Sequence, residues 1–179
     1  GRFVSDKGLP DLLQALVLLR QSGTRPGLTV IGAGPEESAW RQLSQDLDLE
    51  SQVQFLGVRR DAELAAELNR HRVLVVPSRW NETFGIVALE GMACGCLVIG
   101  SEGGGLKEAI GSAGMTYPNG DVAALANCLL RALTDDEIVQ HCLRASAEHL
   151  ARHNPTLIAV RYLDEFQRMK KEVSHVRAC

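Results

Sequence analysis

The chain has 179 residues, a formal net charge of −3 and aromatic residues at 4% of its positions. A chain of this length usually folds as one domain around one buried core. Its basic residues are scattered, and it lacks the positive charge and the stacking aromatic residues of a nucleic-acid-binding protein. No apolar run reaches the length of a membrane span. These features exclude nucleic acid as a partner and predict a single domain.

The cysteines predict a reducing, cytoplasmic environment. Their number is odd and no pair has the spacing of a zinc ribbon, which argues against a disulfide framework and a zinc site. Free cysteines are most often small core residues. We expect structural roles for all five: Cys94, Cys96, Cys128, Cys142 and Cys179.

The first half of the chain alternates helical and strand patterns. Leucines recur at helical spacing up to Ser22-Gly23, and two short apolar runs end in glycine, as buried strands do. Asp61 is placed to cap the helix that follows the second run. The predicted elements are a helix over 9–19, a strand over 28–31, a polar helix over 36–48, a strand over 53–56 and a helix over 61–70.

The second half continues this alternation and then becomes helical only. A third apolar run is closed by Pro77-Ser78, and a fourth ends in Gly100 before three further glycines. Asp121 is placed to cap a long amphipathic helix. The predicted elements are strands over 73–76, 96–99 and 115–116, helices over 84–93, 106–110 and from 122 onward, and a helical tail from about 135 that is interrupted at 153–155.

Alternating strands and helices, with buried four-residue strands, predict a parallel sheet covered on both faces. The fold class is therefore α/β, a doubly wound, Rossmann-like sheet with a helical C-terminal tail. In such folds ligands bind outside the carboxyl ends of the strands, so the loops after Ile31, Leu56, Val76 and Ile99 should share one rim. We expect residues 1–134 to form the α/β domain and 135–179 to pack on it or on a neighbouring domain.

The loop and helix after the third predicted strand contain the candidate site. Glu82 lies in the loop and Glu90 about two helical turns further on. Between them, the amides of 84–87 would begin a helix, where phosphate binds readily, and Gly85 would let a ligand approach the backbone. Two glutamates at this spacing are more often ordinary exposed charges. Their setting, however, suits a long ligand with an anionic middle and hydroxyl groups at both ends, such as a nucleoside diphosphate sugar.

Here the sequence resembles the retaining GT-B glycosyltransferases of the glycogen-synthase and mannosyltransferase type (glycosyl transferases group 1). The pattern Glu-(seven residues)-Glu after Pro-Ser, with Phe-Gly inside it, is similar to their signature. Further landmarks match in order and spacing: Gly1-Arg2 with Lys7-Gly8, 32–35, 55–57, 92–95 and 104–108. Leu97 and Lys107 depart from the family's usual proline, and Gly91 from its usual alanine. The resemblance implies that the chain is the C-terminal, donor-binding half of a GT-B fold.

The resemblance also implies a role for each matching residue. Arg2 and Lys7 would hold the donor diphosphate, and Glu82 would contact the hydroxyl groups of the transferred sugar; these three form the catalytic group. Two cations and a helix end can stabilise a departing diphosphate without a metal or any cofactor. The remaining binding residues would be Val58 beside the nucleobase, Glu90 at the ribose, and Phe84, Gly85, Ile86 and Val87 at the phosphates.

The implied reaction moves a hexosyl or N-acetylhexosaminyl unit from a UDP- or GDP-sugar to a hydroxyl of a glycan or glycolipid, with retention and without metal. The chain opens on Gly1-Arg2, so we expect a preceding strand and an acceptor-binding N-terminal domain to be missing and the fragment alone to be inactive. Peripheral contact with the inner face of the membrane would occur through that half. A non-catalytic nucleotide-sugar-binding module and a nucleotide-sugar epimerase are the alternatives.

Four other motifs are weaker. Gly32-x-Gly34 has Glu37 where a dinucleotide fingerprint needs a third glycine. Asp46-x-Asp48 lies on a polar helix, where solvated carboxylates are common. His149 and His153 are expected to be a surface pair, since no third metal ligand is near in sequence. No nucleophile elbow supports a hydrolase.

Overall fold

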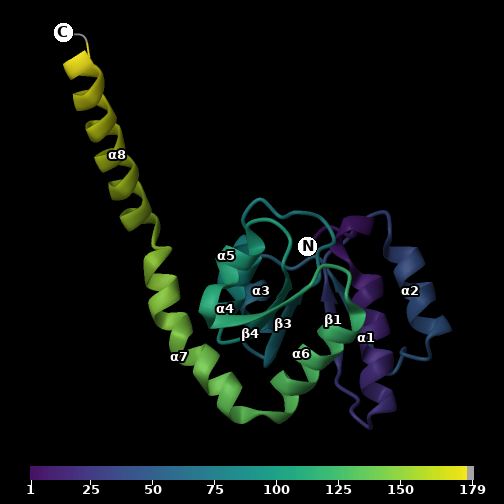
Figure 1. Ribbon diagram of the computed structural model, residues 1–179. Helices are drawn as coiled ribbons and strands as arrows, with labels where there is room; N and C mark the ends of the chain where they lie inside the picture. The colour runs from purple at the N-terminus through teal and green to yellow at the C-terminus, as the bar shows by residue number, and fades with distance from the viewer. Residues whose placement is uncertain (177–179) are drawn as a thin grey trace.

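The computed structural model describes the backbone of residues 1–176 and the side chains of residues 1–170. Strands and helices alternate up to Thr134, and helices alone follow (Figure 1). The strands are β1 (Leu28–Ile31), β2 (Val53–Gly57), β3 (Val73–Val76), β4 (Leu97–Ser101) and β5 (Gly114–Tyr117). The helices are α1 (Leu9–Gln21), α2 (Glu37–Asp46), α3 (Asp61–Leu68), α4 (Ile86–Ala93), α5 (Leu106–Ile110), α6 (Val122–Thr134), α7 (Asp136–Arg152) and α8 (Pro155–Val176), with 3-10 turns η1 (Ser5–Lys7) and η2 (Gly111–Ala113).

All of the strand pairs are parallel, which confirms the predicted class of fold. The strands form two ladders rather than the single sheet that we expected: β1 pairs with β2, and β3, β4 and β5 pair in that order. The segment that precedes α1 adds an isolated parallel bridge between Arg2 and Ala33, just beyond β1. The carboxyl ends of neighbouring strands therefore open toward the same edge.

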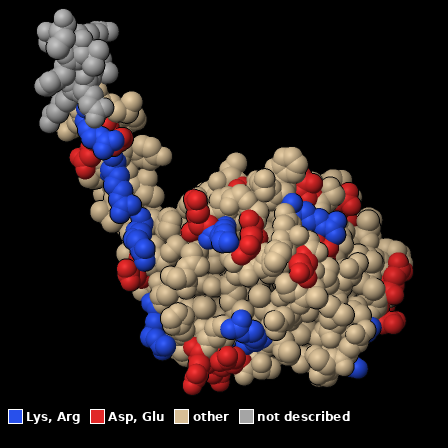
Figure 2. All heavy atoms as spheres, in the orientation of Figure 1, with Lys and Arg blue, Asp and Glu red and all other residues tan. Residues whose placement is uncertain are grey.

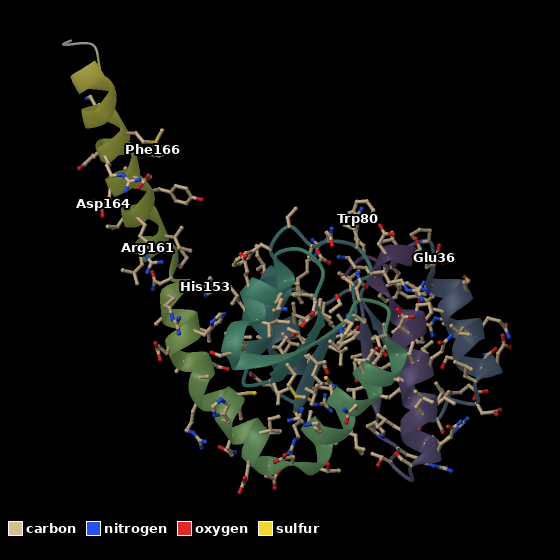
Figure 3. The ribbon with its side chains drawn as sticks, in the orientation of Figure 1. Glu36, Trp80, His153, Arg161, Asp164 and Phe166 are labelled. Carbon is tan, nitrogen blue, oxygen red and sulfur yellow. The ribbon has the colours of Figure 1, made fainter. Side chains whose placement is uncertain are left out.

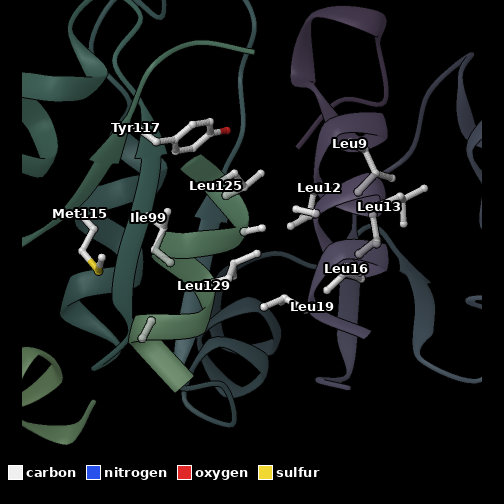
Figure 4. Close-up of a cluster of buried hydrophobic side chains, with 14 of the residues drawn as sticks. Leu9, Leu12, Leu13, Leu16, Leu19, Ile99, Met115, Tyr117, Leu125 and Leu129 are labelled. Atoms are coloured by element: carbon white, nitrogen blue, oxygen red, sulfur yellow. The ribbon is translucent and has the colours of Figure 1, made fainter. Parts of the chain in front are cut away.

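Strand β4 explains why helices cover both faces of the sheet. Its residues are all buried, and successive side chains of a strand point to opposite faces. Leu97 and Ile99 belong to a core cluster with α1 and α6, whereas Val98 belongs to a second cluster with α4 and α5. Figure 4 shows the first cluster, in which Leu12 and Leu19 of α1 point toward α6. The doubly wound arrangement follows from a strand that is apolar on both sides.

The starts of two helices differ in detail from the predictions. Asp61 does not cap α3: Arg60 occupies the cap position and Asp61 is the first helical residue, with a φ of 45°. The helix after β3 begins at Ile86 rather than at Phe84, because Gly85 has a φ of 94°, which lies outside the helical range. A Cβ atom at position 85 would also lie 2.7 Å from Cδ1 of Leu106. A residue without a side chain fits this position.

The tail helices have different surroundings. Helix α7 buries Val139, Cys142 and Ser146 and contacts α4 and η2. Helix α8 extends away from the body (Figure 1), and a row of basic side chains follows it (Figure 2). Its large apolar side chains are exposed: Leu157, Val160, Tyr162, Leu163, Phe166 and Met169. Among the described residues, no helix is both long enough and apolar enough to cross a membrane.

The histidines near the end of α7 correct another expectation. His149 is buried rather than part of a surface pair, and its Nε2 is 2.8 Å from the carbonyl oxygen of Ala109. The ring of His153, labelled in Figure 3, lies against the ring of Phe84 at an angle of 51°, with a centroid separation of 5.6 Å. The junction between α7 and α8 therefore contacts the loop that precedes α4.

The cysteines lie inside the fold or partly so. Cys96 and Cys142 are buried, Cys94 and Cys128 are half-buried, and all four are free thiols. Burial, helped by the neighbouring Cys94, raises the pKa of Cys96 to about 11, so its thiol stays protonated at neutral pH. Cys179 lies outside the described residues.

Candidate functional site

The loops after four strands meet at one edge of the fold. The backbone nitrogen of Gly32, after β1, donates to the oxygen of Gly57, at the end of β2, over 2.9 Å. The bridge between Glu82 and Gly104 joins the loops after β3 and β4. The segment from Arg2 to Gly8 links the two groups, because Arg2 pairs with Ala33 and the oxygen of Asp6 accepts a hydrogen bond from the loop after β3. This edge is the predicted rim.

An ion pair between Lys7 and Glu82 lies where these segments converge. The ammonium group of Lys7 donates a hydrogen bond to Oε1 of Glu82. The hydroxyl of Ser78 donates to the same oxygen over 2.6 Å. Burial alone would raise the pKa of Glu82, but the hydrogen bonds from Lys7 and Ser78 outweigh it, and the pKa lies below its usual value. Glu82 is therefore charged at neutral pH and faces a cation across a partly buried contact.

The loop that carries Glu82 is attached to the ends of two strands. The hydroxyl of Ser101, the last residue of β4, donates to the oxygen of Ser78 over 2.6 Å. The backbone nitrogen of Gly105 donates to the oxygen of Glu82 over 2.7 Å. Both contacts hold main-chain atoms, so the position of Glu82 does not depend on its side-chain bonds alone.

The start of α4 lies directly after this loop and offers free backbone donors. The first four amides of a helix have no partner within it. In the described part of the chain, the amides of Ile86 and Val87 have no protein acceptor, whereas Ala88 bonds the oxygen of Gly85 over 2.9 Å. The side chain of Ile86 is 65% exposed, which leaves the approach to this helix end open to solvent. An anion would be stabilised there by the amides and the helix dipole.

Three other predicted residues, Arg2, Val58 and Glu90, have exposed side chains. Glu90 is the fifth residue of α4, and Val58 directly follows β2. Phe84 is half-buried, and its ring contacts that of His153.

Sequence reasoning missed three residues that hold the site. Ser78 enters the sequence analysis only as part of the Pro77-Ser78 motif, although its hydroxyl donates a hydrogen bond to Glu82. Asp11 and Arg79 form an ion pair across the base of the loop, and neither was singled out. A carboxylate on the leucine-rich face of a predicted helix was the available signal for Asp11. The described residues hold no group of three His, Cys, Asp or Glu side chains that could bind a metal ion.

The comparisons with known proteins agree on one family. The sequence profile described as Glycosyl transferases group 1 matches residues 1–149. The chain is 31% identical over 173 residues to phosphatidyl-myo-inositol mannosyltransferase of Mycobacterium leprae, covering 96% of this chain and 46% of that protein. It is 34% identical over 152 residues to glycogen synthase of Mycobacterium tuberculosis, covering 84% and 36%. The chain thus spans between about a third and a half of the length of the curated relatives that it matches.

Solved structures have the same fold. Sucrose-phosphate synthase from Thermosynechococcus elongatus superposes with a TM-score of 0.81 at 30% identity, over 96% of this chain and 44% of that chain. Anabaena HepE in complex with UDP and glucose superposes with a TM-score of 0.74 at 23% identity, over 90% and 46%. At the lower identity the likeness supports the fold alone.

Proposed function

Because the chain belongs to the glycosyl transferases group 1 family, we propose that it is the donor-binding half of a glycosyltransferase. The observation that carries this proposal is the Lys7–Glu82 ion pair beside the open start of α4. These groups offer a cation, free amides and a carboxylate in succession along one edge. A nucleoside diphosphate sugar presents the complementary series: a diphosphate next to a sugar with hydroxyl groups.

In the proposed complex, the diphosphate lies at the amides of Ile86 and Val87 and takes Lys7 away from Glu82. The carboxylate of Glu82 is then free to accept hydrogen bonds from hydroxyl groups of the sugar. Arg2 adds a second cation, Glu90 binds the ribose, and Val58 lies beside the nucleobase. Lys7, Arg2 and the helix end stabilise the negative charge that develops on the diphosphate when the sugar leaves. We propose a UDP- or GDP-hexose or N-acetylhexosamine as donor, and transfer to a hydroxyl with retention and without metal.

We also propose that the acceptor binds to a further domain of the same protein. The matched relatives are about twice as long as this chain, so their acceptor sites have room in the other half. The apolar side chains of α8, from Leu157 to Met169, are exposed and would be covered by that half. In this chain a protease should cut within α8, and in the longer protein it should not. Equal cleavage in both would contradict the packing of α8 on another domain.

Calorimetric titration of this chain with UDP and with GDP, in the presence of a chelator, tests the donor site. We expect one of the two nucleotides to bind. Lys7→Met and Arg2→Ala should each weaken binding about tenfold or more, because a hydrogen bond to a charged group contributes about 1.5–3 kcal/mol.

Lys107→Met is the matched control. Lys107 forms an ion pair with Glu102 over 3.2 Å at the same edge of the fold but lies on α5, outside the proposed site. Its loss should leave the affinity unchanged. The proposal would be overturned if neither UDP nor GDP bound, or if Lys7→Met and Lys107→Met had equal effects on the affinity.

A further inference from the structure

We propose that the ion pair between Asp11 and Arg79 positions the donor site, by fixing the loop that carries Glu82 against the segment that carries Lys7. The inference rests on the proposed function, which it extends with two residues that do not touch the donor. Their role is to set the distance between the group that binds phosphate and the group that binds the sugar.

The Asp11 carboxylate lies in an unusual place. It is in the first turn of α1, among the leucines that face the core, and its side chain is 3% exposed. Nε of Arg79 donates to Oδ2 of Asp11 over 2.8 Å, and Nη2 donates to Oδ1. Both carboxylate oxygens are therefore used in one two-pronged contact. This geometry restricts the relative orientation of the two side chains more than a single hydrogen bond does.

Arg79 is held at three points by three different segments. Besides the contact of its side chain with Asp11, its backbone nitrogen donates to the oxygen of Asp6 over 2.8 Å. Its backbone oxygen accepts from Nδ2 of Asn119 over 2.7 Å. The backbone of the loop after β3 also contacts the backbone at the start of α1, because a Cβ atom at Gly8 would lie 1.9 Å from the oxygen of Pro77. Arg79 is thus the residue through which the loop after β3 is joined to the start of α1.

The sequence positions connect this joint to the proposed chemistry. Lys7 lies four residues before Asp11, and Glu82 lies three residues after Arg79. The ion pair therefore closes a short ring that contains the Lys7–Glu82 contact. When the donor diphosphate takes Lys7 away, that contact is lost, whereas the Asp11–Arg79 pair remains. Glu82 then keeps its place beside the sugar because its loop is still tied to α1.

Burial of the carboxylate favours a positioning role over a role in stability. A buried ion pair commonly adds no stability compared with apolar side chains of similar volume, because both charges lose their hydration. What the pair provides is one defined orientation of the loop. The guanidinium of Arg79 is 54% exposed at the edge of the fold, so the pair joins the core to the rim of the site.

The test replaces both partners at once, in the variant Asp11→Leu with Arg79→Met. This variant folds without an unpaired buried carboxylate, which a change at Arg79 alone would leave behind. The pKa of the Glu82 carboxyl is measured by carbon-13 NMR. Because the contacts with Lys7 and Ser78 keep this pKa below 4.5, we expect the double variant to move it up toward that value. Arg79→Lys keeps the charge but loses the fork and should give an intermediate shift.

The control removes an ion pair beside the start of β3, at the end of this strand opposite to the loop that carries Glu82. Arg72→Met with Asp136→Leu breaks the contact over 2.6 Å between the start of β3 and α7. Both side chains of this pair are exposed, and its loss should leave the pKa of Glu82 unchanged. An unchanged pKa in the Asp11–Arg79 variant, or the same shift in the control, would overturn the positioning role.

A second measurement, the affinity for nucleotides and nucleotide sugars, separates this inference from the proposed function. The affinity of UDP-glucose relative to UDP, or of GDP-mannose relative to GDP, measures the contribution of the sugar. We expect this ratio to fall several-fold in the Asp11–Arg79 variant and to stay constant in the control. If the unaltered chain binds no nucleotide, the proposed function fails, while the pKa of Glu82 still decides whether the ion pair positions the loop.

Discussion

Two ion pairs at this edge of the fold join the same kinds of residue, a lysine and a glutamate, in different settings. Lys7 and Glu82 meet in a partly buried contact that also includes Ser78. Lys107 and Glu102 meet over 3.2 Å on the surface, where Thr116 adds a hydrogen bond over 3.0 Å. The pair after β3 lies beside the free amides of α4, and its loop is tied to α1. The comparison shows that the surroundings, rather than the pair itself, make a candidate binding site.

The largest expected effect comes from separating the loop after β3 from the start of α1. Gly8 has a φ of 66°, and a Cβ atom there would overlap the oxygen of Pro77. We expect Gly8→Ala to lower the free energy of unfolding by about 3 kcal/mol or more, from the left-handed backbone and the overlap together. Denaturation by urea measures it.

Gly120→Ala is the matched control for this change. Gly120 has a φ of 77° but no atom within 4 Å of a Cβ atom, so it isolates the backbone term of about 1–2 kcal/mol. Equal losses for the two alanine variants would show that the loop does not depend on this contact.

A smaller effect distinguishes the two glutamates. Glu82→Gln removes the carboxylate that competes with phosphate for Lys7, so we expect tighter binding of the nucleoside diphosphate by about 1 kcal/mol. The sugar should then add less affinity than in the unaltered chain. Glu102→Gln should change neither quantity, and calorimetry measures both. Weaker binding of the diphosphate by Glu82→Gln would contradict the exchange of partners by Lys7.

The smallest effect concerns pH. For Glu82, burial raises the pKa, but the contacts with Lys7 and Ser78 lower it further, below the ordinary 4.5. A carboxylate whose pKa is lower in the folded state contributes stability above the unfolded pKa and loses it as the pH falls through the folded value. We expect Glu82→Gln to remove a contribution of less than about 1 kcal/mol at pH 6, and a smaller one at pH 2.

Measured unfolding curves at both pH values, at low and high salt, check this expectation. Hydrogen bonds from Lys107 and Thr116 also lower the pKa of Glu102, which lies at the surface. Salt screens exposed charges more than partly buried ones, so the effect of Glu102 should fade at high salt while that of Glu82 persists. If high salt reduced the contributions of Glu82 and Glu102 equally, the two ion pairs would not differ in their exposure to solvent.

The strands and the rim could be predicted from the sequence because burial on both faces leaves short apolar runs that few other structures produce. Runs such as 28–31 and 73–76 match the observed strands β1 and β3. The position of the loops at the carboxyl ends then follows from the parallel arrangement. The spacing of Glu82 and Glu90 around a helix start singles out Glu82, whereas Lys7 follows only from the resemblance to a family.

The details of the site could not be predicted because they depend on contacts between distant segments. Asp11 and Arg79 are 68 positions apart, and nothing local to either residue indicates the other. The start of α4 could not be predicted for a related reason: Gly85 adopts a left-handed conformation next to Leu106 of another helix. His149 was expected at the surface because its burial under η2 is set by the packing of α7, which no short pattern encodes.

The alternation of β4 between two cores has a consequence for slow opening of the fold. A strand whose neighbouring side chains belong to clusters on opposite faces cannot be released by the loss of either cluster alone. Its amides should therefore exchange with solvent deuterium only through global unfolding. Ser101, at the end of this strand, holds the loop of Glu82. The loop of the candidate site is thus attached to the strand whose amides should exchange most slowly. The amides of α8 should exchange much faster.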